Sequence, residues 1–333
     1  MINRTLLRIK LMQATFALYE SETDTMKQLG KEPTDVAPRQ QTRLVQTAQN
    51  ILGEGFKKTH ELYCCLLSLI PEITRYAQEK IENGRNKFLP SEEELHPNTR
   101  FADNLLAAQL ADNEALHKLR ETLKLHIDWT EHADVIRNLY ADITQQAFYA
   151  DYMQSDDCGY DYDKMLWRKI VTNVFTNNEA LADIIEEDNL YYASDVELVC
   201  SFIVKTIKHF DANAGQEQPL LPLFDDLKDE QMAMDQMKDI ISRWSTYQQL
   251  IDQHTKNWDL ERITLMDRLI MHCALAEICS VPTIPVSVTI NEYVDIAKAY
   301  SSDKSGKFVN AVLDQTAQEL IREKKIIKAV VLR

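Results

Sequence analysis

Residue types that could bind a metal ion occur in three short stretches of the sequence. His60 and Cys64 lie one helical turn apart, a second group contains His126, Asp128, Glu131 and His132, and aspartates recur from Asp156 to Asp163. A structural zinc site needs four ligands in tetrahedral reach, which neither of the first two groups supplies. The aspartates do not match a calcium loop, which alternates its ligands and ends in a bidentate glutamate. We therefore predict no metal and no cofactor.

Catalytic motifs are also missing from the sequence. It contains no glycine-rich phosphate loop, no G-x-S-x-G and no credible pairing of a Cys nucleophile with a His base on a defined element. With only 7 glycines in 333 residues, a loop that wraps a nucleotide is difficult to build. The prediction is a protein that is not an enzyme.

Basic residues of the first predicted helix could contact phosphate groups. Arg4 and Arg8 lie one turn apart, and at 100° per residue they share a stripe with Thr15 and Tyr19. We expect this stripe, and with it both arginines, at the surface. On residue type alone, an ordinary solvated helix face is the alternative interpretation.

A second group of candidates lies near the carboxy terminus. Helical geometry places Lys304 and Lys307 on one polar strip, with Asn310 beside it and Phe308 at the border of the apolar face. Lysine attracts phosphate, an aromatic ring can stack on an unpaired base, and an amide can read a base edge. Without further information, a packed phenylalanine and a surface lysine remain the alternatives.

The charge distribution bears on this interpretation. A net charge of -15 argues against phosphate binding, which requires an excess of Lys and Arg. However, residues 1–20 carry three basic and one acidic side chain, and residues 255–333 carry eleven and ten. The acidity therefore belongs to residues 21–254.

The elements that must position these residues are predicted to be helices. Few glycines and only 9 prolines interrupt the chain. Apolar periodicity predicts helices over about 2–20, 39–81, 195–210 and 260–278, and a last helix that begins at about 305. Another helix is predicted between 278 and 305 and ends near Tyr300. In that helix, Thr289 and Glu292 have capping-box spacing, which predicts a capping box at or near its start. The six scattered cysteines and the lack of a signal peptide or an 18-residue apolar run predict a cytoplasmic protein.

One segment is specific to a family. VSVTINEYVDIAKAYSSDKSGKFVNAVLD, residues 286–314, strongly resembles the signature of the NusB family, and residues 261–278 resemble that family's adjacent helix. The first helix, with Gln13, Ala14 and Phe16, is similar to the family's first helix. The resemblance covers roughly half of the chain and leaves residues 21 to about 165 without a counterpart.

The resemblance implies an all-α fold of two small helical bundles and an RNA-binding adaptor. NusB-type proteins pair with NusE, a ribosomal protein, and load single-stranded boxA RNA onto the antitermination complex of RNA polymerase. Carried over by position, the implied RNA-binding residues are Arg4, Arg8, Phe16, Lys304, Lys307, Phe308 and Asn310. Asp267 matches an acidic residue on the surface that faces NusE.

The resulting domain prediction has three parts. Residues 1–20 form the first NusB-like helix, residues 21–163 an acidic helical insertion, and residues 164–333 the rest of the NusB-like domain. Thr5 and Leu6 stand where the family often has basic residues, and His272 where it has an arginine. An alternative is therefore a protein-binding scaffold that kept the fold and lost RNA binding. The NusB-like domain of an RNA cytosine methyltransferase is a weaker alternative, because no methyltransferase domain accompanies it.

Overall fold

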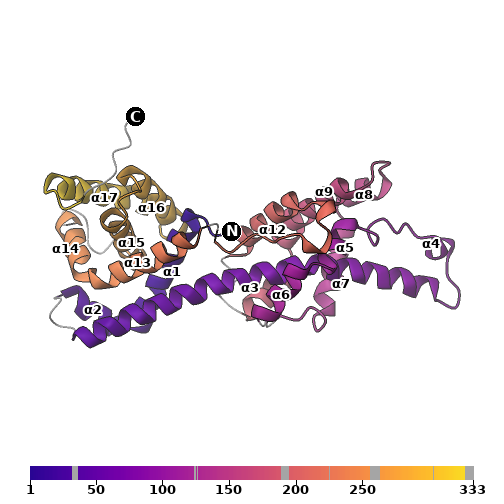
Figure 1. Ribbon diagram of the computed structural model, residues 1–333, viewed down its shortest axis with the longest axis horizontal. Helices are drawn as coiled ribbons and strands as arrows, with labels where there is room; N and C mark the ends of the chain where they lie inside the picture. The colour runs from indigo at the N-terminus through magenta and orange to yellow at the C-terminus, as the bar shows by residue number, and fades with distance from the viewer. Residues whose placement is uncertain are drawn as a thin grey trace. The chain divides into compact units, whose positions relative to one another are not determined.

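A computed structural model gives the fold (Figure 1) and describes residues 1–31, 37–123, 125, 127–188, 195–224, 226–255, 263–302 and 304–326. Within these ranges the chain is helical and contains no β-strand, only one isolated bridge between Ile2 and Phe224. The predicted all-α class is confirmed. The chain divides into two compact units, of which unit 1 holds 1–56 with 223–333 and unit 2 holds 57–222.

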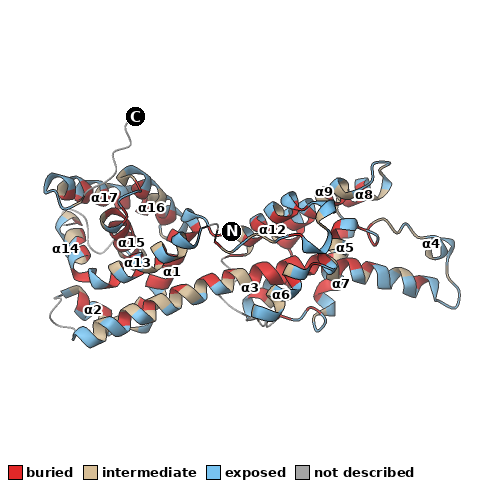
Figure 2. Cartoon of the chain, in the orientation of Figure 1, coloured by how far each residue is buried: buried red, intermediate tan, exposed pale blue. Residues whose placement is uncertain are grey.

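Unit 1 contains both groups of candidate residues. Its helices are α1 (Arg4–Ser21), α2 (Thr23–Lys31), the first part of α3 (Pro38–Arg85), α13 (Leu227–Ser242), α14 (Trp244–Thr255), α15 (Leu265–Ser280), α16 (Val286–Tyr300) and α17 (Ser305–Arg322). At the centre is α15, which contacts α1, α13, α14, α16 and α17. Figure 2 shows α15 mainly in the colour of buried residues. A helix that is apolar nearly all round is stable only when other helices cover it, which explains its central position.

Unit 2 is a separate helical body with its own core. It contains the rest of α3, α4 (Glu92–Leu95), α5 (Leu105–Ala111), α6 (Glu114–Leu123), α7 (Ala133–Thr144), α8 (Ala147–Gln154), α9 (Tyr160–Ile170), the π-helical turn η2 (Val171–Phe175), α10 (Glu179–Asp188), α12 (Val196–His209) and the 3-10 helix η3 (Ala212–Glu217). Trp167 is fully buried, and its indole N–H donates to Asn104 at 3.1 Å. Asn104 also caps α5 by accepting from Ala107 N. The core thus satisfies its polar atoms internally.

The helix predicted over 39–81 is confirmed and corresponds to most of α3. Helix α3 is continuous and contributes residues to both units. The compact units divide at residues 56/57 and 222/223, whereas the predicted parts, which follow the family resemblance, have their bounds at 20/21 and 163/164. The physical reason is that α2 packs on α14 and the start of α3 on α13, where Gln49 Nε2 donates to Met234 O at 3.0 Å. Residues 21–56 consequently share the core of unit 1.

The predicted capping box at Thr289 and Glu292 is wrong. Helix α16 begins at Val286, directly after Pro285, whose fixed φ suits the residue before a helix. A capping box occurs instead at the start of α15, where Thr264 and Asp267 bond each other's backbone N–H. Thr289 and Glu292 are thereby available for contacts with other helices.

Candidate nucleic-acid interface

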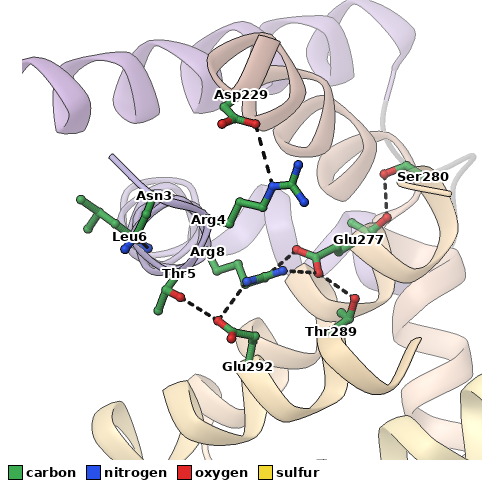
Figure 3. Close-up of polar contacts among 11 residues, drawn as sticks. Asn3, Arg4, Thr5, Leu6, Arg8, Asp229, Glu277, Ser280, Thr289 and Glu292 are labelled. Carbon is green, nitrogen blue, oxygen red and sulfur yellow. Dashed lines mark hydrogen bonds and ion pairs between the residues drawn. The ribbon is translucent and has the colours of Figure 1, made fainter. Parts of the chain in front are cut away.

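The amino-terminal end of α1 is fixed by a side-chain cap. Asn3 accepts from Leu6 N at 2.9 Å, so that Arg4 and Thr5 lie in the first helical turn (Figure 3). The Arg4 side chain is 57% exposed and its nearest acidic partner, Asp229 of α13, lies 4.0 Å away. An ion pair this long between exposed groups contributes little stability, so Arg4 can leave it to bind a phosphate.

Arg8, one turn further along α1, points into the unit. Its Nε and Nη2 donate to the two carboxylate oxygens of Glu277 at 2.8 and 3.0 Å, and Nη1 donates to Glu292 Oε2 at 2.9 Å (Figure 3). The side chains of Arg8 and Glu277 are 5% and 2% exposed. Burial alone would lower the pKa of Arg8, but the hydrogen bond and the charge of Glu277 raise it above its ordinary value. Arg8 stays charged and is held by two carboxylates.

The expectation that Arg8 lies at the surface is therefore wrong. Thr15 of the same predicted stripe is also fully buried, and its hydroxyl donates to Leu11 O at 2.7 Å. The reason is that α1 is covered on several sides, by α2, α13, α15 and α16. Arg8 joins three helices and has no donor directed at solvent for a phosphate.

Three residues that the sequence interpretation did not assign to the site complete the cluster around Arg8. Glu277 is an acidic residue in the otherwise apolar α15, and Thr289 of α16 donates to it at 2.7 Å. Glu292 accepts from Thr5 at 2.8 Å in addition to Arg8. A glutamate within an apolar helix was a detectable signal, because a buried carboxylate requires a partner.

Phe16 is the exposed aromatic residue of α1. It is 37% exposed, although its neighbours Leu18 and Thr15 are fully buried. At 100° per residue it lies within about 20° of Thr5 around the helix axis, and Thr5 contacts α16. Phe16 therefore lies on the side of α1 that faces α16. An RNA-binding site along α16 would require Phe16 on this side.

The start of α17 carries the carboxy-terminal candidates. Lys304, Lys307 and Asn310 are exposed, and neither lysine makes an ion pair with any residue in the described part of the chain. Phe308 is 7% exposed and belongs to the apolar core. Burial leaves too little of its ring accessible for a base to stack on it, so the geometry favours the packing alternative for Phe308.

Helix α16 connects the two groups of candidates. Glu292 contacts α1, while Lys298 lies against the start of α17, where its Cγ is 2.9 Å from the position that a Cβ on Gly306 would occupy. Six residues at the rise of an α-helix separate these contacts by about 9 Å. A chain lying along α16 can thus reach the amino-terminal end of α1 and the start of α17.

Asp267, expected on the surface that faces a protein partner, is 2% exposed. Its Oδ2 accepts from Thr264 N at 3.4 Å, and its Oδ1 has no hydrogen-bond partner among the described residues. The expectation of a surface carboxylate is therefore wrong. Its role in the capping box explains the burial, because the carboxylate folds back over the first turn of α15.

Other kinds of site are not apparent in the described ranges. No cluster of three or more His, Cys, Asp or Glu side chains there could hold a metal ion; His126, a member of one candidate group, lies outside these ranges. None of the described helices is long and apolar enough to cross a membrane.

Comparison with known proteins assigns the carboxy-terminal part of the chain to a family. A model of the NusB family matches residues 202–318. The transcription antitermination protein NusB of Methylacidiphilum infernorum is 33% identical over 127 residues, which are 37% of this chain and 87% of that protein. NusB of Chloroherpeton thalassium is 46% identical over 70 residues, 21% of this chain and 33% of that protein.

The alignment with a solved structure of T. maritima NusB is 26% identical and covers 49% of this chain and 95% of that one, with a TM-score of 0.28. The range matched by the family model includes all of α16 and the exposed start of α17. The chain belongs to the NusB family.

Proposed function

We propose that this protein is an RNA-binding adaptor in transcription antitermination, which pairs with NusE, binds single-stranded RNA of the boxA type and works in the cytoplasm with RNA polymerase. The observation that carries the proposal is the start of α17, where Lys304 and Lys307 are exposed beside Asn310. In a chain of net charge -15, two such lysines without ion pairs to described residues form a local site for phosphate.

The residues of unit 1 divide into binding and positioning roles. Lys304, Lys307 and Arg4 attract phosphates, while Asn310 and Phe16 contact bases by hydrogen bonding and stacking. Arg8 acts as a positioning residue, because its contacts with Glu277 and Glu292 hold α1 against α15 and α16.

NusE is proposed to bind near the start of α15. There Asp267 would act indirectly, by fixing the first turn of α15, since its carboxylate is buried. A partner is expected because only three exposed cations, Arg4, Lys304 and Lys307, are assigned to phosphate contacts, and RNA affinity depends strongly on the number of phosphates neutralised.

The proposal is tested by titrating fluorescently labelled boxA-type RNA with the wild type and two double variants over a range of salt concentrations. Lys304→Ala/Lys307→Ala removes the proposed phosphate contacts. Lys205→Ala/Lys208→Ala is the matched control, because these lysines of α12 are exposed and have the same spacing. Each contact to single-stranded RNA contributes about 0.7 to the slope of log affinity against log salt, so the first variant should flatten the slope by about 1.4. Equal slopes for the two variants would contradict the proposal.

A protein-binding scaffold without RNA affinity is the second candidate. The burial of Arg8 in ion pairs with Glu277 and Glu292 favours it, because one of the two amino-terminal arginines is unavailable to phosphate. It predicts the same absence of RNA binding in the wild type and in both lysine variants.

A further inference from the structure

Unit 2 carries two large apolar side chains that are almost completely exposed. Phe88 is 98% exposed and Leu89 is 83% exposed, in the segment between α3 and α4. We call this pair the apolar tip. Figure 2 shows mainly exposed residues at the end of α3 and around α4. Single exposed apolar residues are common, but two adjacent ones extended into solvent are typical of a contact surface.

The apolar tip is held by contacts on both sides. After it, Ser91 and Glu94 form a capping box, with Glu94 N donating to Ser91 Oγ at 3.2 Å and Ser91 N to Glu94 Oε2 at 2.9 Å. Before it, Lys87 pairs with the same Glu94, and Lys87 N donates to Gly84 O at 3.3 Å. The segment is therefore ordered before any partner binds, which reduces the entropy lost on association.

A groove of about 510 Å³ lies next to the apolar tip. Its apolar wall includes Tyr76 and Ile81 of α3, Tyr140 of α7 and Met153 of α8. The rings of Tyr76 and Tyr140 meet edge to face with centroids 5.4 Å apart. Aromatic and methionine side chains are enriched where proteins accept apolar groups.

The apolar tip and the groove belong to one surface of unit 2. Lys87, which precedes the tip, and Glu93 and Glu94, which follow it, all line the groove. The groove does not take up its own tip, because Phe88 remains 98% exposed. Each molecule thus presents a protruding apolar pair and a matching recess side by side.

We propose that a second copy of this chain occupies the groove, so that two molecules exchange their apolar tips across a two-fold axis. Such an isologous contact requires complementary features on the same patch of each subunit, as found here. The rim carries both signs of charge, and Lys80 and Glu93 make no ion pair with any described residue, so that two copies can oppose these unlike charges.

The expected interface is small. An aromatic side chain buries about 150–250 Å² and a leucine somewhat less, so two tips and the surfaces they cover amount to roughly 1,000 Å². This is near the lower limit of specific interfaces and predicts a dimer that dissociates on dilution.

Sedimentation equilibrium of the full chain over a concentration series tests the proposal. The wild type should dimerise, and Phe88→Ser/Leu89→Ser should weaken the dimer at least about a hundredfold. Leu227→Ser is the matched control, because Leu227 of α13 in unit 1 is 76% exposed and should not affect dimerisation. Thermal melts verify that each variant is folded, as expected for exposed positions.

A mixing experiment tests the exchange itself. Met153→Lys should obstruct the groove and leave the tip intact, so neither this variant nor the tip double variant should dimerise alone. Mixed together, they should associate more strongly than either variant alone and more weakly than the wild type, because one of the two tip–groove contacts is intact. A wild type that is monomeric at every concentration, a tip variant that dimerises like the wild type, or a mixture that associates no more strongly than either variant alone would overturn the proposal.

Discussion

Replacing Arg8 by methionine should destabilise unit 1 strongly, although the sequence suggested a surface arginine. The change keeps an unbranched, flexible side chain and removes the guanidinium group, whose Nε, Nη1 and Nη2 donate to Glu277 and Glu292. Glu292 is 32% exposed and can turn to water, whereas the Glu277 side chain is 2% exposed and would keep its charge within the core. Removing one partner of a buried ion pair costs about 3–5 kcal/mol, most of it from the charge left behind.

Thermal denaturation followed by circular dichroism measures this effect. A loss of about 3–5 kcal/mol corresponds to a decrease in Tm of about 6–20 °C for a unit of this size. Arg4→Met is the control, because Arg4 is exposed and its 4.0 Å contact with Asp229 should contribute less than about 0.5 kcal/mol. In the double variant Arg8→Met/Glu277→Met no buried charge remains unpaired, so much of the stability should return. If Arg8→Met and Arg4→Met melt together, Arg8 is not an internal residue and the reasoning is refuted.

Two other predictions concern buried side chains of unit 1. Burial, together with nearby Arg268, lowers the pKa of His272 to about 3. Below about pH 6.5 the unfolded chain therefore binds a proton at this residue and the folded state does not, so the free energy of unfolding should fall as the pH drops from 6.5 toward 3. In urea unfolding, the wild type should lose about 1 kcal/mol more than His272→Gln between pH 7 and 5.5, and equal losses would contradict this. Phe308→Ala should lower the free energy of unfolding by about 3–5 kcal/mol because it leaves a cavity, while the folded fraction binds RNA like the wild type. Normal stability with weakened RNA binding would instead assign Phe308 to the RNA site.

Local patterns predicted the helices well, because apolar periodicity and the scarcity of glycine act within a few turns of the chain. The end of α16 at Tyr300 and the start of α17 at Ser305 agree with the sequence interpretation. The start of α16 does not, because Pro285 determines it and the Thr289–Glu292 spacing only resembles a cap. A short spacing motif is weak when a stronger local constraint lies one turn earlier.

The burial of Arg8 could not be obtained from α1 alone. A helical wheel shows which residues share a face, but not which helices cover that face. The partners of Arg8 lie 269 and 284 residues away, on α15 and α16. Likewise, the division into units passes through the uninterrupted helix α3, where the sequence has no break to indicate it.

The most direct test of the RNA-binding role is a fluorescence anisotropy titration of boxA-type RNA and a scrambled RNA with the full chain, with and without NusE. The proposal predicts weak binding by the chain alone, and tighter, boxA-selective binding when NusE is present. No detectable binding under either condition, or equal affinity for both RNAs with and without NusE, would contradict it.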